Sequence, residues 1–329
     1  MDTILLVVVV LVALGFDFTN GFHDTANAVA TSVSTRAVSP RLAVAIAAIA
    51  NLAGAFVTTA VAKTVGKGII DTGLANEKTI LAALIGAITW NLITWWLGLP
   101  SSSSHALIGG LVGAAMAHSG FKGVQWHGLV HNVAIPAVAA PAIAFAGAFV
   151  LLVALYWLFV RATPRFANRT FRLGQLASGT WVAFTHGAND AQKTMGVIAL
   201  ALFETGHLSH FYIPTWVIVA AGLAIGAGTY VGGWRIMRTL GQRVISMEPA
   251  SGFAAQTTAG FTIYFATRFG YPLSTTHVIS GAVIGAGATR RLSAVRWGVA
   301  GNIVFAWLLT IPAAGLVAAA LYWPVEGLF

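Results

Sequence analysis

Long apolar runs that almost no charged residue interrupts constrain this chain more than any other feature. Examples are Ile4–Leu14, Leu42–Ile49 and Ala137–Val160. Charged residues make up only 8% of the chain, against about 25% in soluble domains. A helix needs roughly 17–25 apolar residues to cross the hydrocarbon core, whereas a barrel strand would show about ten residues of alternating character. The continuous runs therefore predict an all-α, polytopic membrane protein.

The net charge of +9 lies in short gaps between the apolar runs. Clusters such as Arg161–Arg172 and Arg235–Arg243 have the distribution of topology-setting and lipid-facing charges. Because no basic and aromatic module is present, we expect no nucleic-acid binding. The chain has no cysteine, which excludes thiolate chemistry and cysteine-ligated metals.

The sequence also repeats itself. Phe18–Asp24 aligns with Phe184–Asp190, with identical Phe, Thr, Gly and Asp residues. Further along, Gly98–His105 aligns with Gly270–His277. These matches occur in the same order and at nearly constant offset, which indicates an internal duplication.

The duplication divides the expected fold into a first transmembrane repeat (1–160), a short basic cytoplasmic linker (161–172) and a second transmembrane repeat (173–329). In each repeat we expect a polar break in the first helix, then a full span (about 42–62 and 213–234). A Pro-Ser/Thr break follows, and a long Trp-led segment ends the repeat. We expect about 10–12 membrane segments, including two re-entrant hairpins. Matching broken helices in two halves are typical of inverted-repeat secondary transporters.

The first polar break contains an acid in each repeat, Asp24 and Asp190. An acid inside apolar sequence needs a partner or an ion. Neighbouring Gly and Asn residues favour unwound backbone, whose carbonyls could coordinate a cation. On a continuing helix Asn27 would share a face with Asp24, and Lys193 with Asp190. The alternative is a packing kink whose Asp caps a helix, but its occurrence in both repeats favours an ion site.

The second break is rich in hydroxyl groups in each repeat, at Pro100–His105 and Pro272–His277. Free N–H groups and the positive dipole end at a helix start form an anion site, and an ordinary N-cap is the alternative. Lys193 could neutralise either Asp190 or the anion. The candidate substrate ligands are Ser102, Ser103, Ser104, Ser274, Thr275, Thr276, Gln192 and Lys193.

At these motifs the chain resembles the inorganic phosphate transporter (PiT) family. The matching stretches are Phe16–Ala30, Pro100–His105, His186–Gly196 and Pro272–His277. The resemblance implies an inverted-repeat helical fold in which the Ser/Thr tips of two re-entrant hairpins meet phosphate near the midplane. It also implies a homodimer. The coupling-ion residues that it implies, for sodium or a proton, are Asp24, Asn27, Asn189 and Asp190.

Two departures from the family pattern stand out. Many relatives carry an acid where Gln256 stands, and the long hydrophilic loop of animal members is reduced here to Arg161–Arg172. The chain therefore resembles a compact prokaryotic member of the inner (plasma) membrane.

The favoured function is cation-coupled symport of inorganic phosphate by alternating access, in membrane lipid and without a cofactor. The same scaffold could carry sulfate, and an uncoupled anion channel would tolerate neutral residues at both Asp positions. An intramembrane hydrolase could use a tip serine with His105 as nucleophile and base. Because the motif recurs at Thr276 and His277, it does not suit a single catalytic centre, and we expect no enzyme.

Overall fold

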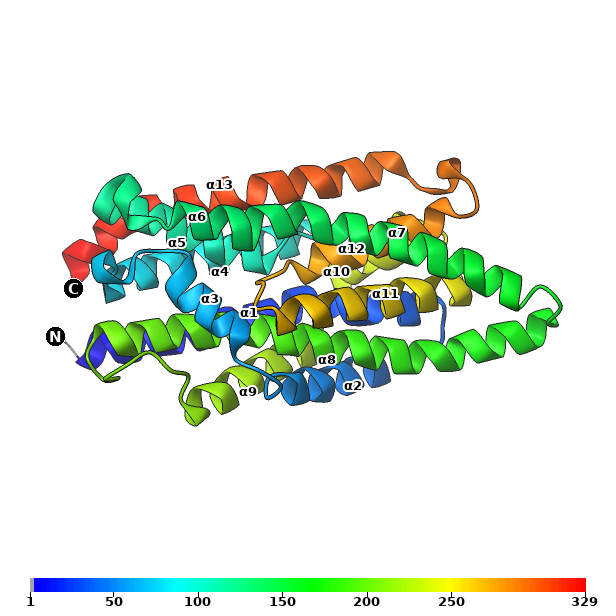
Figure 1. Cartoon of the computed structure of the whole chain (residues 1–329), viewed down its shortest axis with the longest axis horizontal. Coiled ribbons are helices and arrows are strands. Elements are labelled where there is room, and N and C mark those ends of the chain that lie inside the picture. Colours follow the sequence, from blue (N-terminus) through cyan, green and yellow to red (C-terminus); the bar gives the residue numbers. More distant parts are fainter. Residues whose placement is uncertain (1–2) are drawn as a thin grey trace.

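The structure is a computed structural model that describes residues 3–329, arranged as a bundle of long helices (Figure 1). The first half contains α1 (Thr3–Ser34), α2 (Pro40–Gly54), α3 (Ala60–Gly68), α4 (Glu77–Leu97), α5 (Ser103–Ser119), α6 (Trp126–Leu129) and α7 (Ile135–Leu158). The second half contains α8 (Pro164–Glu204), α9 (Thr215–Val231), α10 (Trp234–Arg238), α11 (Pro249–Arg268), α12 (Thr275–Ala288) and α13 (Trp297–Leu328). Short 3-10 and π segments complete the helical elements, at η1 (Thr72–Leu74), η2 (Gly120–Gly123), η3 (Val130–Ala134), η4 (Thr239–Arg243) and η5 (Leu292–Ala294).

The breaks expected in the first helix of each half are wrong, because α1 and α8 remain helical through Asn20–Asn27 and His186–Lys193. The glycines of these motifs allow close packing instead of unwinding. A Cβ atom on Gly21 would overlap the backbone of α9, and one on Gly187 would overlap the backbone of α2. Small residues of this kind let membrane helices approach backbone to backbone.

The two expected full spans are shorter than predicted. α2 ends at Gly54, and a turn separates it from α3. α9 ends at Val231 and bends by 58° into the segment that contains α10. The long Trp-led segments are present, as the continuous helix Trp126–Leu158 and as α13.

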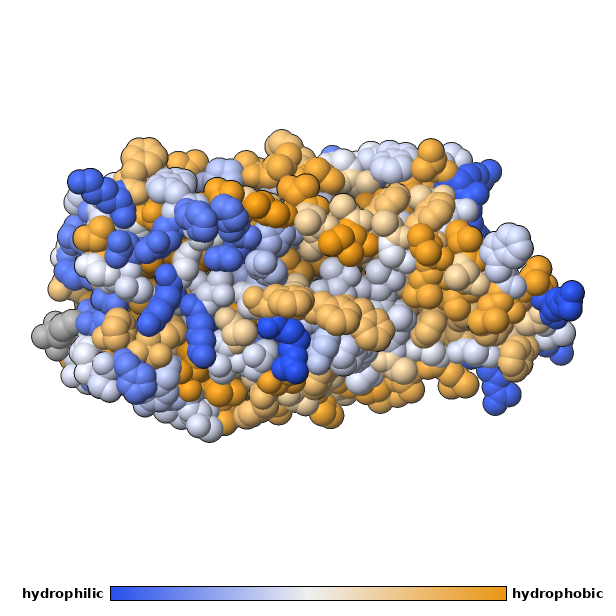
Figure 2. All heavy atoms as spheres, in the orientation of Figure 1, coloured by the Kyte–Doolittle hydropathy of each residue, from blue (hydrophilic) through white to orange (hydrophobic). Residues whose placement is uncertain are grey.

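Several helices have the length and composition of membrane spans. Within residues 3–329 these are α1, α4, the helix Trp126–Leu158 and α13, with α9 and Trp234–Arg243 as a fifth if the bent pair counts as one. Large apolar side chains such as Leu308 and Leu316 are more than 70% exposed. Figure 2 shows hydrophobic residues over much of the visible face, with hydrophilic residues gathered toward the two ends, one group reaching the middle. The chain is therefore a multi-pass membrane protein.

The two halves exchange contacts. α1 packs on α9 and α8 on α2, while α13 packs on α5 and α7 on α12. Within each half, α4 with α5 and α11 with α12 form a helical hairpin. In Figure 1, α1 and α8 run in opposite directions along the long axis, and so do α7 and α13. The hairpins thereby bring their tips to the centre of the bundle, against α1 and α8.

Candidate functional site

Each hairpin tip begins a helix with a serine cap. The Oγ atom of Ser102 accepts a hydrogen bond from the His105 N–H (3.1 Å), and that of Ser274 accepts one from the His277 N–H (3.2 Å). Ser102 and Ser274 are therefore N-caps, which was the alternative to a role as anion ligands. The caps fix the starts of α5 and α12, where free N–H groups and positive dipole ends remain. The next two hydroxyl residues of each tip are buried, namely Ser103, Ser104, Thr275 and Thr276.

A helix of the opposite half holds each tip. Asn27 of α1 donates to the hydroxyl of Thr276 in the second half (2.9 Å). Lys193 of α8 donates to the hydroxyl of Ser104 in the first half (2.5 Å), and also to the Leu273 carbonyl (2.8 Å). The two tips also touch each other, because the ring centroids of His105 and His277 lie 4.6 Å apart. The site is therefore assembled from both halves.

Two carboxylates lie beside the tips and carry different partners. Asp190 Oδ1 accepts a hydrogen bond from Lys193 Nζ at 2.6 Å, and both side chains are fully buried. Asp24 Oδ1 lies 2.6 Å from His23 Nδ1. His186 stands between the acids, with its Nε2 atom 3.4 Å from Asp190 Oδ2 and 3.8 Å from Asp24 Oδ2.

The arrangement can hold a cation. Ligand atoms of Asp24, His186 and Asp190 all lie within 4.8 Å of one another. Within the described residues 3–329, the Oδ1 atoms of Asn27 and Asn189 have no hydrogen-bond partner, because each amide points its NH₂ group at other residues. Buried oxygens without partners beside carboxylates are the ligands that a hard cation prefers.

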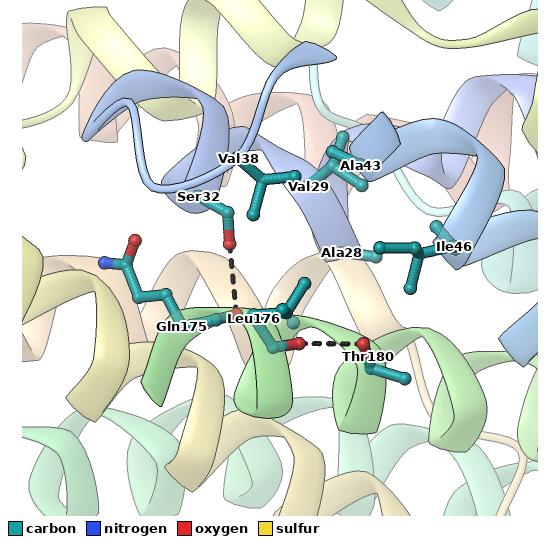
Figure 3. Close-up of a pocket in the computed structure, with 11 residues that line it drawn as sticks. Ala28, Val29, Ser32, Val38, Ala43, Ile46, Gln175, Leu176 and Thr180 are labelled. Carbon is teal, nitrogen blue, oxygen red and sulfur yellow. Dashed lines mark hydrogen bonds between the residues drawn. The ribbon is translucent and has the colours of Figure 1, made fainter. Parts of the chain in front are cut away.

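Two other polar residues that the sequence singled out have different roles. Gln192 accepts hydrogen bonds from the N–H groups of Val61 (2.8 Å) and Ala62 (3.2 Å), and so caps α3 instead of facing a tip. Gln256 accepts from Ser178 (2.9 Å) and donates to Ser32 (2.8 Å). Ser32 borders a cavity of about 20 Å³ between α1, α2 and α8 (Figure 3), large enough for one water molecule.

Two histidines that the sequence motifs did not single out as site residues, His23 and His186, are buried beside the acids. A signal was present in the aligned repeats, where His23 matches Asn189 and His186 matches Asn20. A polar residue therefore stands at both positions in both halves. Polar residues at matching positions of apolar segments are candidates for a shared polar site.

Comparison with known proteins places the chain among transporters. A profile described as the Phosphate transporter family matches residues 20–318. A probable low-affinity inorganic phosphate transporter of Rhizobium meliloti (strain 1021) is 52% identical over 324 residues, which cover 98% of this chain and 97% of the relative. A protein of the same description from Bacillus subtilis (strain 168) is 43% identical over 329 residues, covering 99% and 98%.

A solved structure described as the sodium-dependent phosphate transporter matches with a TM-score of 0.89 and 25% identity, over 99% of this chain and 100% of that chain. The relatives are transporters by description, which confirms the expectation that this chain is not an enzyme. The resemblance stated from the motifs is likewise confirmed: the chain belongs to the phosphate transporter family.

Proposed function

We propose that this protein is a cation-coupled symporter of inorganic phosphate that works by alternating access. One observation carries the proposal. Two helix starts with free N–H groups converge on the buried ammonium of Lys193, which contacts Ser104 at one tip and the Leu273 carbonyl at the other. Phosphate binds at helix N-termini beside a lysine because the dipole and the ammonium both favour its charge.

The charges of the site explain why a cation must bind with phosphate. Asp24 and Asp190 bring two negative charges, and Lys193 brings one positive charge. The charges of the two acids and the lysine therefore sum to a negative value before the anion arrives. Like charges 4 Å apart repel by about 4 kcal/mol at an effective dielectric constant of about 20. Phosphate alone would be repelled, and a cation at the acids offsets this cost.

We assign the coupling cation to Asp24, Asn27, Asn189 and Asp190. Ligand atoms of the two acids lie within 4.8 Å of each other, and within residues 3–329 the Oδ1 atom of each asparagine is buried without a hydrogen-bond partner. The description of the matching solved structure as sodium-dependent supports sodium over a proton. Four unpartnered or carboxylate oxygens also suit a metal ion better than a proton, which needs only one acceptor.

Phosphate is favoured over sulfate because it can donate a hydrogen bond at neutral pH. Asp24 Oδ1 can accept one, and it already faces the tip hydroxyls of Ser103 (3.4 Å) and Thr276 (3.5 Å). A transporter is favoured over a channel because the acids and tip hydroxyls are at most 2% exposed. An enclosed site must open to each side in turn.

The remaining expectations belong to the same proposal. The opposed directions of α1 and α8 and of α7 and α13 support an inverted repeat, divided at 161–172. The bacterial relatives support a place in the inner (plasma) membrane. Assembly as a homodimer stays a prediction of the family resemblance.

Uptake of labelled phosphate into proteoliposomes tests the function. We expect accumulation against the phosphate gradient when an inward sodium gradient is imposed, and no effect of excess sulfate. The variant Glu248→Gln is a matched control, since this acid is 43% exposed at its side chain and lies outside the centre. Mere equilibration of phosphate, under an imposed sodium gradient and under an imposed proton gradient, would support a channel, and competition by sulfate would refute phosphate as the specific substrate.

A further inference from the structure

A third buried acid, Asp17, lies in α1 outside the site described above. Its side chain is 0% exposed, and neither carboxyl oxygen has a hydrogen-bond partner among the described residues. A lone carboxylate costs several kcal/mol to bury in a membrane protein unless a partner or an ion compensates it. Such a group is a candidate ion site by default.

The neighbours of this carboxyl are also buried and unpartnered. The side chains of Asn20 and Thr194 lie near the Asp17 carboxyl, but within residues 3–329 neither the Asn20 amide nor the Thr194 hydroxyl is in hydrogen-bond geometry with a partner. Both are at most 1% exposed. Three polar side chains without partners therefore meet at one place between α1 and α8.

This place lies further along the same helix pair as the central acids. Asp17 precedes Asp24 by seven residues, or two turns, which puts them on one face about 10 Å apart. Thr194 follows Asp190 by one turn of α8. Because α1 and α8 are antiparallel, both steps lead from the centre toward the end of the molecule that carries the chain termini (Figure 1).

Within residues 3–329, no cationic side chain forms an ion pair with Asp17. Lys193 contributes at longer range, but its ammonium binds Asp190 at 2.6 Å and contacts both hairpin tips. The repeat offers no second copy of this acid, since Ala183 stands at the matching position of α8. The place is therefore distinct from the central pair of acids, which is duplicated.

The opposite end of the helix pair shows what a satisfied polar cluster looks like in this protein. There the Gln256 amide bonds with Ser178 and Ser32. The Gln175 side chain accepts from Thr35 (2.5 Å) and donates to the Pro249 carbonyl (2.9 Å). These neutral groups satisfy one another, whereas the groups around Asp17 do not.

We propose that Asp17, Asn20 and Thr194 form a sodium site that is separate from the central coupling site and lies on the path of the ion between the centre and the terminal end of the bundle. The proposal rests on the proposed function only for the identity of the ion. Two carboxyl oxygens, one amide oxygen and one hydroxyl oxygen supply an all-oxygen ligand set of the kind that hard cations prefer. A sodium ion would partner all four oxygens and neutralise the charge, whereas a proton on Asp17 would engage only one acceptor.

Equilibrium binding of radioactive sodium ions to the purified protein in detergent tests this site without relying on transport. We expect Asp17→Asn to bind one sodium ion fewer per protein than the unaltered chain, and Asp24→Asn to retain the Asp17 ion. In proteoliposomes, Asp17→Asn should need more sodium for half-maximal phosphate uptake, while its half-saturating phosphate concentration at saturating sodium is unchanged.

A pair of threonine variants keeps the test decisive if Asp17→Asn fails to fold. Thr194→Val removes a ligand oxygen at nearly constant volume and should weaken sodium binding about tenfold, the loss of roughly 1.4 kcal/mol typical of an interaction with a charged group. Thr185→Val is the matched control, because that buried hydroxyl of α8 already donates to the Val182 carbonyl (3.1 Å).

The possible results separate the two proposals. Unchanged sodium number and affinity in both Asp17→Asn and Thr194→Val overturn the Asp17 site, and so does a change confined to the pH dependence of uptake, which would make Asp17 a proton carrier. If Asp17→Asn binds one sodium ion fewer but the unaltered protein shows no sodium-driven phosphate uptake, the Asp17 site is supported and the proposed sodium-coupled symport is refuted.

Discussion

Removing the ammonium of Lys193 should lower the stability of the protein by an amount that can be estimated from its buried contacts. The variant Lys193→Met keeps the side-chain volume but leaves Asp190 as a buried charge without its 2.6 Å partner. Breaking a buried ion pair from one side costs about 3–5 kcal/mol, which is about two to four powers of ten in the unfolding equilibrium. Asp190→Asn should cost a similar amount, because the ammonium then loses its carboxylate.

The double variant Asp190→Asn/Lys193→Met separates pairing from packing. It removes both charges, so its loss should be smaller than the sum of the two single losses by at least about 2 kcal/mol. Unfolding titrations in mixed micelles, followed by tryptophan fluorescence, measure all three. The half-exposed pair of Glu248 and Arg290 is the control, since such pairs contribute about 1 kcal/mol or less. Additive losses at Asp190 and Lys193 would refute the assignment of a coupled buried pair.

Three further predictions concern packing, capping and coupling. Gly113→Ala should destabilise the protein by about 1–3 kcal/mol or prevent folding, because a Cβ there would overlap the α13 backbone. Gly301→Ala, in α13 with nothing near its Cβ position, should gain about 0.5–1 kcal/mol in the same titration, and equal effects at both glycines would contradict the close approach. Ser102→Ala should cost about 1 kcal/mol through the lost cap of α5, and an unchanged unfolding midpoint would argue against that cap. Asp24→Asn and Asp190→Asn should each abolish gradient-driven phosphate uptake while the protein remains inserted, and normal uptake by both variants would remove the ion-site assignment.

The hydrophobic pattern and the internal repeat of the sequence predicted most of the fold. Apolar runs predicted the helices, and the starts of α5 and α12 lie inside the predicted motifs Pro100–His105 and Pro272–His277. The breaks expected in α1 and α8 are absent because a glycine in a helix can have either of two effects. It can loosen the backbone, or it can admit a neighbouring helix, as Gly21 and Gly187 do. Only the position of α9 and α2, which the sequence does not supply, distinguishes the two.

Which residues belong to the site depends on how each helix is rotated about its axis as much as on residue type, and the sequence does not give that rotation. Gln192 and Lys193 are neighbours in sequence, but successive residues of a helix point about 100° apart. Lys193 therefore reaches the tips while Gln192 turns toward α3. His23 was missed for the related reason that its contact with Thr94 (3.0 Å) joins residues far apart in sequence. Asp17 was missed because it has no counterpart in the second repeat.

The exchange of contacts between the halves gives the proposed cycle a physical basis. Asn27 binds the tip of the second half, and Lys193 binds the tip of the first. Both helices also supply the acids that we assign to the cation. In the proposed cycle, a cation at Asp24 and Asp190 would change the electrostatic field at the residues that hold the tips, and phosphate between the tips would compete with Ser104 for the ammonium of Lys193. Each ligand thus alters the contacts that the other requires, which is the reciprocity that coupling demands. Neither tip can move away from α1 or α8 without breaking a contact that the bound ions influence, so opening to either side depends on what the centre holds.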